Sequence, residues 1–167
     1  LSNFAGGILI LILKPFVVGD YVSACGCEGT VAVISLFYTT LHTVDNRNVV
    51  LPNGSLSNSN ITNYSANEIR RVDMSVDVGY GSDLKKAREV IMDILNQDER
   101  ILKDPAPIVA VDNLGDSGVN VLIRPWVKCE DYWAVKWSVL EAVHDRLNAE
   151  QIDIPFPQMT VHLDQNS

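Results

Sequence analysis

Residues 1–22 read LSNFAGGILILILKPFVVGDYV, and the first thirteen of them carry no charged side chain. Within them Phe4–Leu13 is apolar throughout, and Lys14-Pro15 ends the run. A helix over residues 1–14 would be about 20 Å long at ~1.5 Å per residue, which is shorter than the ~30 Å hydrocarbon core of a bilayer. It cannot cross a membrane alone, and a helix that is apolar on every side suits burial in protein or lipid. A buried strand, a core helix and a piece of a membrane helix therefore all remain open.

Two details of this stretch favour a helix that bends or approaches another backbone closely. The pair Gly6-Gly7 lowers helix stability by about 1 kcal/mol per Gly relative to Ala. Small residues in a helix are typical of close packing in membranes and of bends. The Pro at position 15 ends the helix, and the preceding Lys can extend to a membrane interface. Because the chain starts abruptly and without Met, we expect further residues upstream of Leu1.

The overall composition is that of a folded acidic protein. Hydrophobic residues make up 47% and charged residues 20% of the 167 residues, and 13 basic against 21 acidic side chains give a net charge of −8. An acidic chain repels phosphate backbones, so we expect no nucleic-acid partner. Three Cys, an odd number, do not form a disulfide framework, which favours a reducing compartment.

Residues 15–68 carry the pattern of a small β domain. Gly19-Asp20 indicates a turn, the run Thr30–Thr40 is β-prone, and a polar turn at 45–48 separates two strands of a hairpin. Short strands at this density predict a small barrel or sandwich. Residues 55–67 are rich in Ser and Asn and predict a loop or linker.

Residues 69–163 have a different pattern. Alternation over 71–78 predicts a strand, and Ser82 is a candidate cap for the helix that follows. Two further strands, a helix capped by Asp131 and a last strand over Met159–Leu163 complete the order strand–helix–strand–strand–helix–strand. This order predicts a ferredoxin-like α/β domain in which the last strand pairs within its own sheet.

No constellation of catalytic residues emerges. Cys25 and Cys27 lie two residues apart, but the other Cys and the three His are too scattered to complete a tetrahedral zinc site. The turn at residues 79–82 lacks the spacing and the Lys of a phosphate loop. We therefore expect no metal, no cofactor, no catalytic residue and no enzymatic activity.

Several short motifs follow one another along the chain: Asn3-x-Ala5-x-Gly7, Lys14-Pro15-Phe16, Gly19-Asp20, Gly29-Thr30-Val31, Thr39-Thr40, Pro52-Asn53-Gly54, Arg100-Ile101-Leu102-Lys103-Asp104 and Pro155-x-Pro157-Gln158-Met159. Their order and spacing resemble the small-conductance mechanosensitive channel family (MscS-like), and the similarity covers essentially the whole chain.

The resemblance implies an α+β fold in four parts. Residues 1–14 would be the second half of the pore helix, a short membrane-associated helix, and 15–68 an Sm-like small β barrel. Residues 69–152 would form the ferredoxin-like α/β domain. Residues 153–167 would hold a strand and tail, and the strand would join copies from other subunits in an inter-subunit β barrel instead of pairing within its own sheet. The first membrane helices of the family have no counterpart in these residues.

The resemblance also implies a function. The expected protein is a homoheptameric ion channel of the inner (plasma) membrane, multi-pass at full length, with this region as its cytoplasmic vestibule. It would open under membrane tension and release ions and small osmolytes during hypo-osmotic shock, in contact with membrane lipids. The implied residues are Asn3, Ala5, Gly6, Gly7, Phe37 and Gly54 for the pore helix and its coupling, Lys14, Pro15 and Phe16 for the helix exit, and Met159, Val161 and Leu163 for the inter-subunit barrel. Of these, Asn3 is expected to hydrogen-bond the turn at Gly54, and Phe37 to pack under the helix.

The residues alone are also compatible with a different class of protein. The same pattern fits a soluble oligomeric scaffold module, in which a small β barrel and a ferredoxin-like domain assemble without transport activity. In that interpretation Phe4–Leu13 is a buried strand or an oligomer-contact helix. Membrane partitioning would distinguish the two classes.

Overall fold

The computed structural model describes residues 1–165, and the chain divides into two compact units, the first being Leu1–Glu68 and the second beginning at Ile69. Unit 1 contains α1 (Ser2–Leu13), β1 (Tyr21–Ala24), β2 (Cys27–Ile34), β3 (Tyr38–His42), β4 (Asn48–Pro52), α2 (Asn53–Ser57) and β5 (Ile61–Asn63). Unit 2 contains β6 (Ile69–Arg71), β7 (Met74–Val78), α3 (Leu84–Gln97), β8 (Ile108–Leu114), β9 (Val119–Arg124), β10 (Trp126–Lys128), the 3₁₀ turn Cys129–Asp131 and α4 (Tyr132–Ala149).

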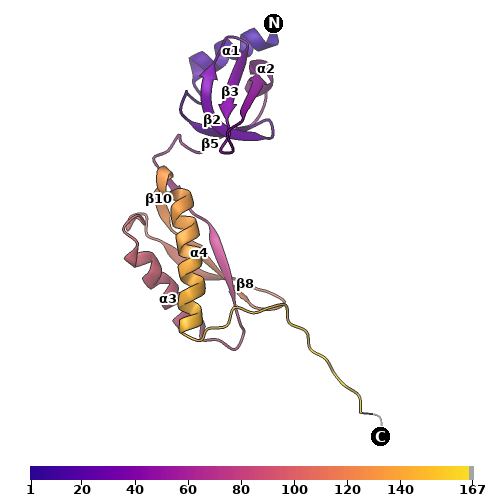
Figure 1. The fold of residues 1–167 in the computed structure, drawn as a ribbon, viewed down its shortest axis with the longest axis vertical. Coiled ribbons are helices and arrows are strands. Elements are labelled where there is room, and N and C mark those ends of the chain that lie inside the picture. Colours follow the sequence, from indigo (N-terminus) through magenta and orange to yellow (C-terminus); the bar gives the residue numbers. More distant parts are fainter. Residues whose placement is uncertain (166–167) are drawn as a thin grey trace. The chain divides into compact units, whose positions relative to one another are not determined.

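Unit 1 is built on a five-stranded antiparallel sheet with the order β4-β3-β2-β1-β5. Its core contains Ile10 from α1 and Phe16 just after it, both 2% exposed, together with Val22, Ala24, Val31, Leu41, Leu51 and Leu56. The helix α1 lies beside α2 (Figure 1). The apolar N-terminal stretch is therefore a helix, and one stripe of it belongs to the core of the β unit.

Three expectations for unit 1 need correction. The run Thr30–Thr40 is not one strand, because β2 ends at Ile34 and the Ser35 N–H donates to the Tyr38 carbonyl 2.8 Å away, which closes a turn over Ser35–Phe37. Residues 55–67 are not only a loop, because they contain most of α2 and β5, and β5 pairs with β1. Within residues 1–165 the sheet ends at β4 and β5, and no strand pair closes it into a barrel.

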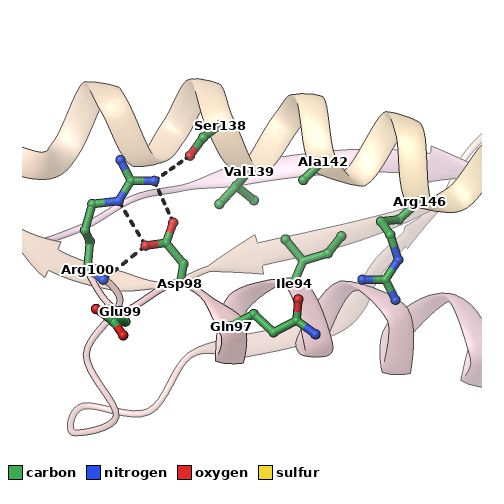
Figure 2. A pocket seen from close by; sticks show the side chains of 9 residues that line it. All are labelled: Ile94, Gln97, Asp98, Glu99, Arg100, Ser138, Val139, Ala142 and Arg146. Carbon is green, nitrogen blue, oxygen red and sulfur yellow. Dashed lines mark hydrogen bonds and ion pairs between the residues drawn. The ribbon is translucent and has the colours of Figure 1, made fainter.

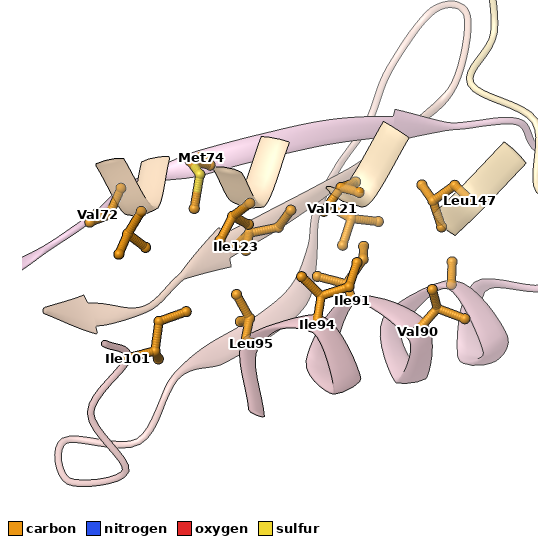
Figure 3. Packing of buried hydrophobic residues seen from close by; sticks show 14 of the residues in the cluster. Val72, Met74, Val90, Ile91, Ile94, Leu95, Ile101, Val121, Ile123 and Leu147 are labelled. Carbon is orange, nitrogen blue, oxygen red and sulfur yellow. The ribbon is translucent and has the colours of Figure 1, made fainter. Parts of the chain in front are cut away.

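Unit 2 is a three-stranded antiparallel sheet, β7-β9-β8, whose apolar face packs against α3 and α4. Strand β9 shows the alternation of a sheet with one buried face, since Val119, Val121 and Ile123 are buried and the residues between them are not. Figure 3 shows Val121 and Ile123 facing Ile91, Ile94 and Leu95 of α3. A two-stranded ribbon of β6 and β10 is the second sheet of this unit.

The order strand–helix–strand–strand–helix is present in unit 2, but the last predicted strand is not formed in the described chain. Residues 152–165 contain no helix or strand, and Met159, Val161 and Leu163 are 85%, 65% and 85% exposed. The expectation that this segment pairs within its own sheet is wrong, because β7 and β8 are the two edges of that sheet and neither accepts it. The cap of α3 is Asp83 instead of Ser82, and its carboxylate accepts from the Lys86 N–H.

Within residues 1–165, no helix combines the length and the apolar character that crossing a bilayer requires.

The core of unit 2 allows a direct test of its packing. Ile91 is fully buried and Ile108 is 51% exposed. We expect Ile91→Ala to lower the free energy of unfolding by about 2–4 kcal/mol, because it leaves a cavity, and Ile108→Ala to lower it by less than about 1 kcal/mol. Tryptophan fluorescence during urea unfolding measures this unit alone, because Trp126, Trp133 and Trp137 all lie in it. Equal losses in the two variants would contradict the packing described.

Candidate functional site

The helix α1 contacts the rest of unit 1 through its glycine pair. A Cβ at Gly6 would overlap the Asn53 carbonyl group and lie 2.8 Å from the Gly54 nitrogen. A Cβ at Gly7 would overlap the Leu36 carbonyl group and lie 2.9 Å from Asn53 Nδ2. We call these backbone groups of Leu36, Asn53 and Gly54 the α1 seat. The helix α1 runs unbroken from Ser2 to Leu13, and its two glycines allow close approach of two backbones.

One hydrogen bond joins the start of α1 to the start of α2. The Gly54 N–H donates to Asn3 Oδ1 at 3.1 Å. This N–H lies in the first turn of α2, where backbone donors have no partner inside the helix. A Cβ at Gly54 would lie 2.9 Å from Asn3 Oδ1 and 3.1 Å from the Ser2 carbonyl oxygen. The structure thus brings together Asn3, Gly6, Gly7 and Gly54 at the seat.

Phe37 and Ala5 lie at the border of this contact. The ring of Phe37 faces that of Phe4, with centroids 6.2 Å apart and planes 44° apart, and both rings are partly exposed. Phe37 therefore packs against α1 through the ring of Phe4. Ala5 is exposed on the side of α1 away from the seat.

The exit of α1 is a sharp turn into the core. Lys14 adopts a left-handed conformation with φ 47°, and its N–H donates to the Ile10 carbonyl at 2.9 Å, which ends the helix. Pro15 follows, and Phe16 enters the core of unit 1 at 2% exposure. The exit residues thus fix the direction in which the chain leaves α1.

The remaining surface of α1 is apolar and uncovered in a single chain. The six consecutive residues at positions 8–13 of α1 are all apolar, and all of them except Ile10 are at least 37% exposed; the exposed side chains are Ile8, Leu9, Leu11, Ile12 and Leu13. Such a surface is characteristic of a helix that meets lipid or another protein surface. The three barrel candidates, Met159, Val161 and Leu163, are likewise exposed, in the C-terminal segment of unit 2.

Sequence reasoning missed two residues beneath the seat. Thr39 and Asn53 are both 0% exposed, and Thr39 Oγ1 donates to Asn53 Oδ1 at 2.7 Å. The Asn53 Nδ2 group donates to the carbonyls of Ser35 (2.8 Å) and Leu36 (3.2 Å). Asn53 follows a Pro and precedes a Gly, a pattern that predicts an exposed turn, so the sequence gives no signal of its burial.

Unit 2 contains an open groove of about 600 Å³ between α3 and α4 (Figure 2). Arg100 Nη2 donates to Asp98 Oδ2 at 2.7 Å and to Ser138 Oγ at 2.9 Å, so it ties the end of α3 to α4. Arg146 Nη1 donates to Asp93 Oδ2 at 3.1 Å. Since the guanidinium groups of Arg100 and Arg146 already have carboxylate partners, they hold α3 and α4 together and do not form an open anion site. The hydrogen bonds from the Arg100 side chain hold the pKa of Asp98 below its ordinary value.

Metal chemistry finds no support in the described part of the chain, residues 1–165, where no three His, Cys, Asp or Glu side chains lie together as a metal site requires.

Comparison with known proteins covers both units. A family model described as "Mechanosensitive ion channel, beta-domain" matches residues 1–66, and one described as "Mechanosensitive ion channel MscS, C-terminal" matches residues 72–154. An uncharacterized MscS family protein of Synechocystis is 42% identical over 165 residues, which are 99% of this chain and 56% of that protein. A small-conductance mechanosensitive channel of Edwardsiella ictaluri is 40% identical over 99% of this chain and 58% of its own length.

Among solved structures, the crystal structure of Helicobacter pylori MscS in its closed state is similar with a TM-score of 0.92 and 36% identity. The match covers 99% of this chain and 66% of that one. The present chain therefore spans somewhat more than half the length of these curated relatives and about two thirds of that structure.

Replacing Gly7 by Ala has two opposite expected effects on the stability of α1, and the sign of the measured change shows which is larger. Helix propensity alone predicts that Gly7→Ala stabilises α1 by about 1 kcal/mol. Overlap with the seat predicts the opposite, a loss of about 1–3 kcal/mol as the helix is pushed away. We expect the overlap to dominate, so that amide hydrogen exchange in α1 becomes faster. Ala5→Ser, which adds one atom on the exposed side of the same helix, serves as the control. Slower exchange in Gly7→Ala would show that Gly7 does not lie in close contact with the α1 seat.

The Asp98–Arg100 pair predicts a pH dependence. Because the pKa of Asp98 is lowered in the folded state, its stabilisation is present above the unfolded value and is lost as pH falls through the folded pKa. We expect Asp98→Asn to lower the free energy of unfolding of unit 2 by about 1 kcal/mol near pH 7, since the pair is partly exposed. The difference from the unmodified chain should shrink below about pH 4. Asp112→Asn controls for the loss of one negative charge, and a difference that does not change with pH would contradict this assignment.

Proposed function

Because this chain belongs to the MscS family of mechanosensitive ion channels, we propose that it is part of a channel subunit that opens under membrane tension and releases ions and small osmolytes during hypo-osmotic shock. The relatives with a named activity are channels and not enzymes. The whole activity is a proposal, because the chain spans only part of its relatives.

The observation that carries this proposal is the division of α1 into one buried stripe and an exposed apolar surface. Its Gly6, Gly7 and Ile10 stripe is buried in unit 1, while the rest of the helix is apolar and exposed. A helix of this kind joins two environments: it is fixed to a β unit on one side and is compatible with lipid or with neighbouring subunits on the other. This supports the second half of a pore helix in residues 1–14, with membrane lipids as one partner.

We place the coupling between bilayer and vestibule at the α1 seat. Tension favours the state that occupies more membrane area, so a channel opens when α1 and the parts attached to it shift between two packings. Asn3, Gly6, Gly7, Gly54 and the neighbouring ring of Phe37 are the contacts that such a shift would make or break. Ala5 faces away from the seat, toward the environment outside unit 1.

Self-association completes the proposed channel. We propose a homo-oligomer, expected to be a heptamer, in which copies of the exposed Met159, Val161 and Leu163 segment pair to form a small barrel. In this arrangement residues 15–68 form the Sm-like β domain and 69–152 the α/β domain of a vestibule on the cytoplasmic side of the inner membrane. The alternation of apolar and polar residues in the last segment supports strand pairing with other copies, since the segment has no strand partner in the described chain.

The direct test is a patch recording of the full-length channel in liposomes. We expect suction to open channels in a tension-dependent way, and cells that lack other tension-gated channels to survive hypo-osmotic shock when they express it. We expect Asn3→Ala and Gly54→Ala to alter recovery from inactivation by about fivefold or more, because loss of one part-buried hydrogen bond changes a two-state equilibrium by about 1 kcal/mol.

The exposed Asn60, changed to Ala, is the matched control. Absence of any tension-activated current in the full-length protein would refute the proposed function. Normal currents with unchanged recovery in both seat variants would refute only the coupling role of the seat.

A further inference from the structure

Resting on the proposed function, we propose that Asn53 is the positioning residue that assembles the α1 seat, and that the buried hydroxyl of Thr39 holds its side chain in the required orientation. Both residues are fully buried polar side chains in unit 1. Neither touches the exposed surface of α1, so each would act through the backbone groups on which the helix rests.

Asn53 joins the start of α2 to the turn and strand at residues 35–39. Its backbone N–H donates to the Phe37 carbonyl at 2.9 Å, and its Nδ2 group donates to the carbonyls of Ser35 and Leu36. Its Oδ1 accepts from Thr39 in β3. A single residue at the start of α2 therefore holds the carbonyl groups of the whole turn between β2 and β3.

The atoms that Asn53 holds are the atoms that α1 contacts. Gly6 lies on the Asn53 carbonyl group, and Gly7 lies on the Leu36 carbonyl group and beside Asn53 Nδ2. Gly54, which binds Asn3, is the next residue in the chain. If the turn at 35–37 separated from the start of α2, the two glycine contacts would no longer share one surface, and α1 would lose its seat.

Thr39 decides which way the amide of Asn53 points. With Oδ1 toward the Thr39 hydroxyl, both Nδ2 hydrogens face carbonyl oxygens and every polar atom has a partner. The reversed amide would place Oδ1 against two carbonyl oxygens in a buried site, where unpaired and repelling polar atoms cost most. Removing the hydroxyl leaves Oδ1 unsatisfied and therefore weakens the arrangement that forms the seat.

The test is amide hydrogen exchange of the full-length protein, which requires no conduction. We expect Thr39→Val, which is nearly isosteric, to speed exchange in α1 and at residues 53–57 by about tenfold, as expected for loss of a buried hydrogen-bond donor. Thr40→Val, at the adjacent and partly exposed position, should leave both segments unchanged. Thr39→Ser, which keeps the donor, should stay close to the unmodified protein.

Two outcomes of exchange would overturn the proposal. One is exchange in α1 that changes less than twofold in Thr39→Val, or that rises equally in Thr39→Ser. The other is a rise spread evenly over β1 to β5, which would show that Thr39 supports the sheet as a whole and not the seat. Where Thr39→Val does not yield folded protein, Asn53→Asp, which removes the Nδ2 donor while keeping the shape of the side chain, takes its place with the same expected pattern.

Patch recordings separate this inference from the proposed function. We expect Thr39→Val to alter recovery from inactivation in the same direction as Asn3→Ala, and the double variant to change it less than the sum, because both act on one seat. Fully additive effects would overturn the positioning role. If the full-length protein shows no tension-activated current, the proposed function fails, while the exchange pattern still decides whether Asn53 assembles the seat.

Discussion

The close approach of α1 to the backbone of the β unit is the constraint on which the rest of unit 1 depends. Two adjacent glycines remove the side chains that would otherwise separate the helix from the carbonyl groups of Leu36 and Asn53. Each glycine costs a helix interior about 1 kcal/mol. That cost is offset by burial of Ile10, worth about 2 kcal/mol, and by the contacts made at the seat.

The seat in turn constrains the loops beneath it. A helix can rest on two separate carbonyl groups only if those groups lie on one surface, which requires the turn at 35–37 and the start of α2 to be fixed to each other. Backbone groups of turns are usually satisfied by water, but here a buried side chain satisfies them. The run Thr30–Thr40 therefore breaks at Ser35, because its carbonyl groups pair with Asn53 and not with a neighbouring strand.

Local pattern was sufficient to predict much of the fold. The hairpin on either side of the 45–48 turn and the two helices of unit 2 follow from turn chemistry and periodicity, and the structure confirms each. The apolar run before Lys14 was compatible with a strand or a helix, and the resemblance to a family favoured the helix that the structure has. Three features depended on distant partners: the break at Ser35, the helix and strand within 55–67, and the unpaired state of Met159–Leu163. A five-residue helix and a three-residue strand have almost no propensity of their own, so only the neighbours β1 and α1 determine them.

In the candidate site, too, some residues could be predicted from local motifs and others depend on distant partners. The motif residues Asn3, Gly7 and Gly54 were accessible through resemblance, since their types and spacing carry the pattern. Thr39 and Asn53 also lie in matching motifs, yet as a strand residue and a turn residue they were not selected as site residues. Their importance rests on full burial and on hydrogen bonds that span 14 and 18 residues, which no local window contains.

A seat made by glycine contacts has a physical consequence for switching. Dispersion contacts between closely packed backbones fall steeply within an ångström of separation, and the Gly54–Asn3 hydrogen bond requires the same approach. Lifting α1 by about 0.5–1 Å therefore forfeits roughly a quarter to a half of the dispersion energy at the seat, while the apolar outer surface of the helix gains nothing from water. In the proposed channel, a second packing of α1 would therefore be separated from the docked arrangement by less favourable intermediates. A contact of this kind would convert a gradual lateral force on α1 into an abrupt change, which is the behaviour required of the coupling element proposed for this chain.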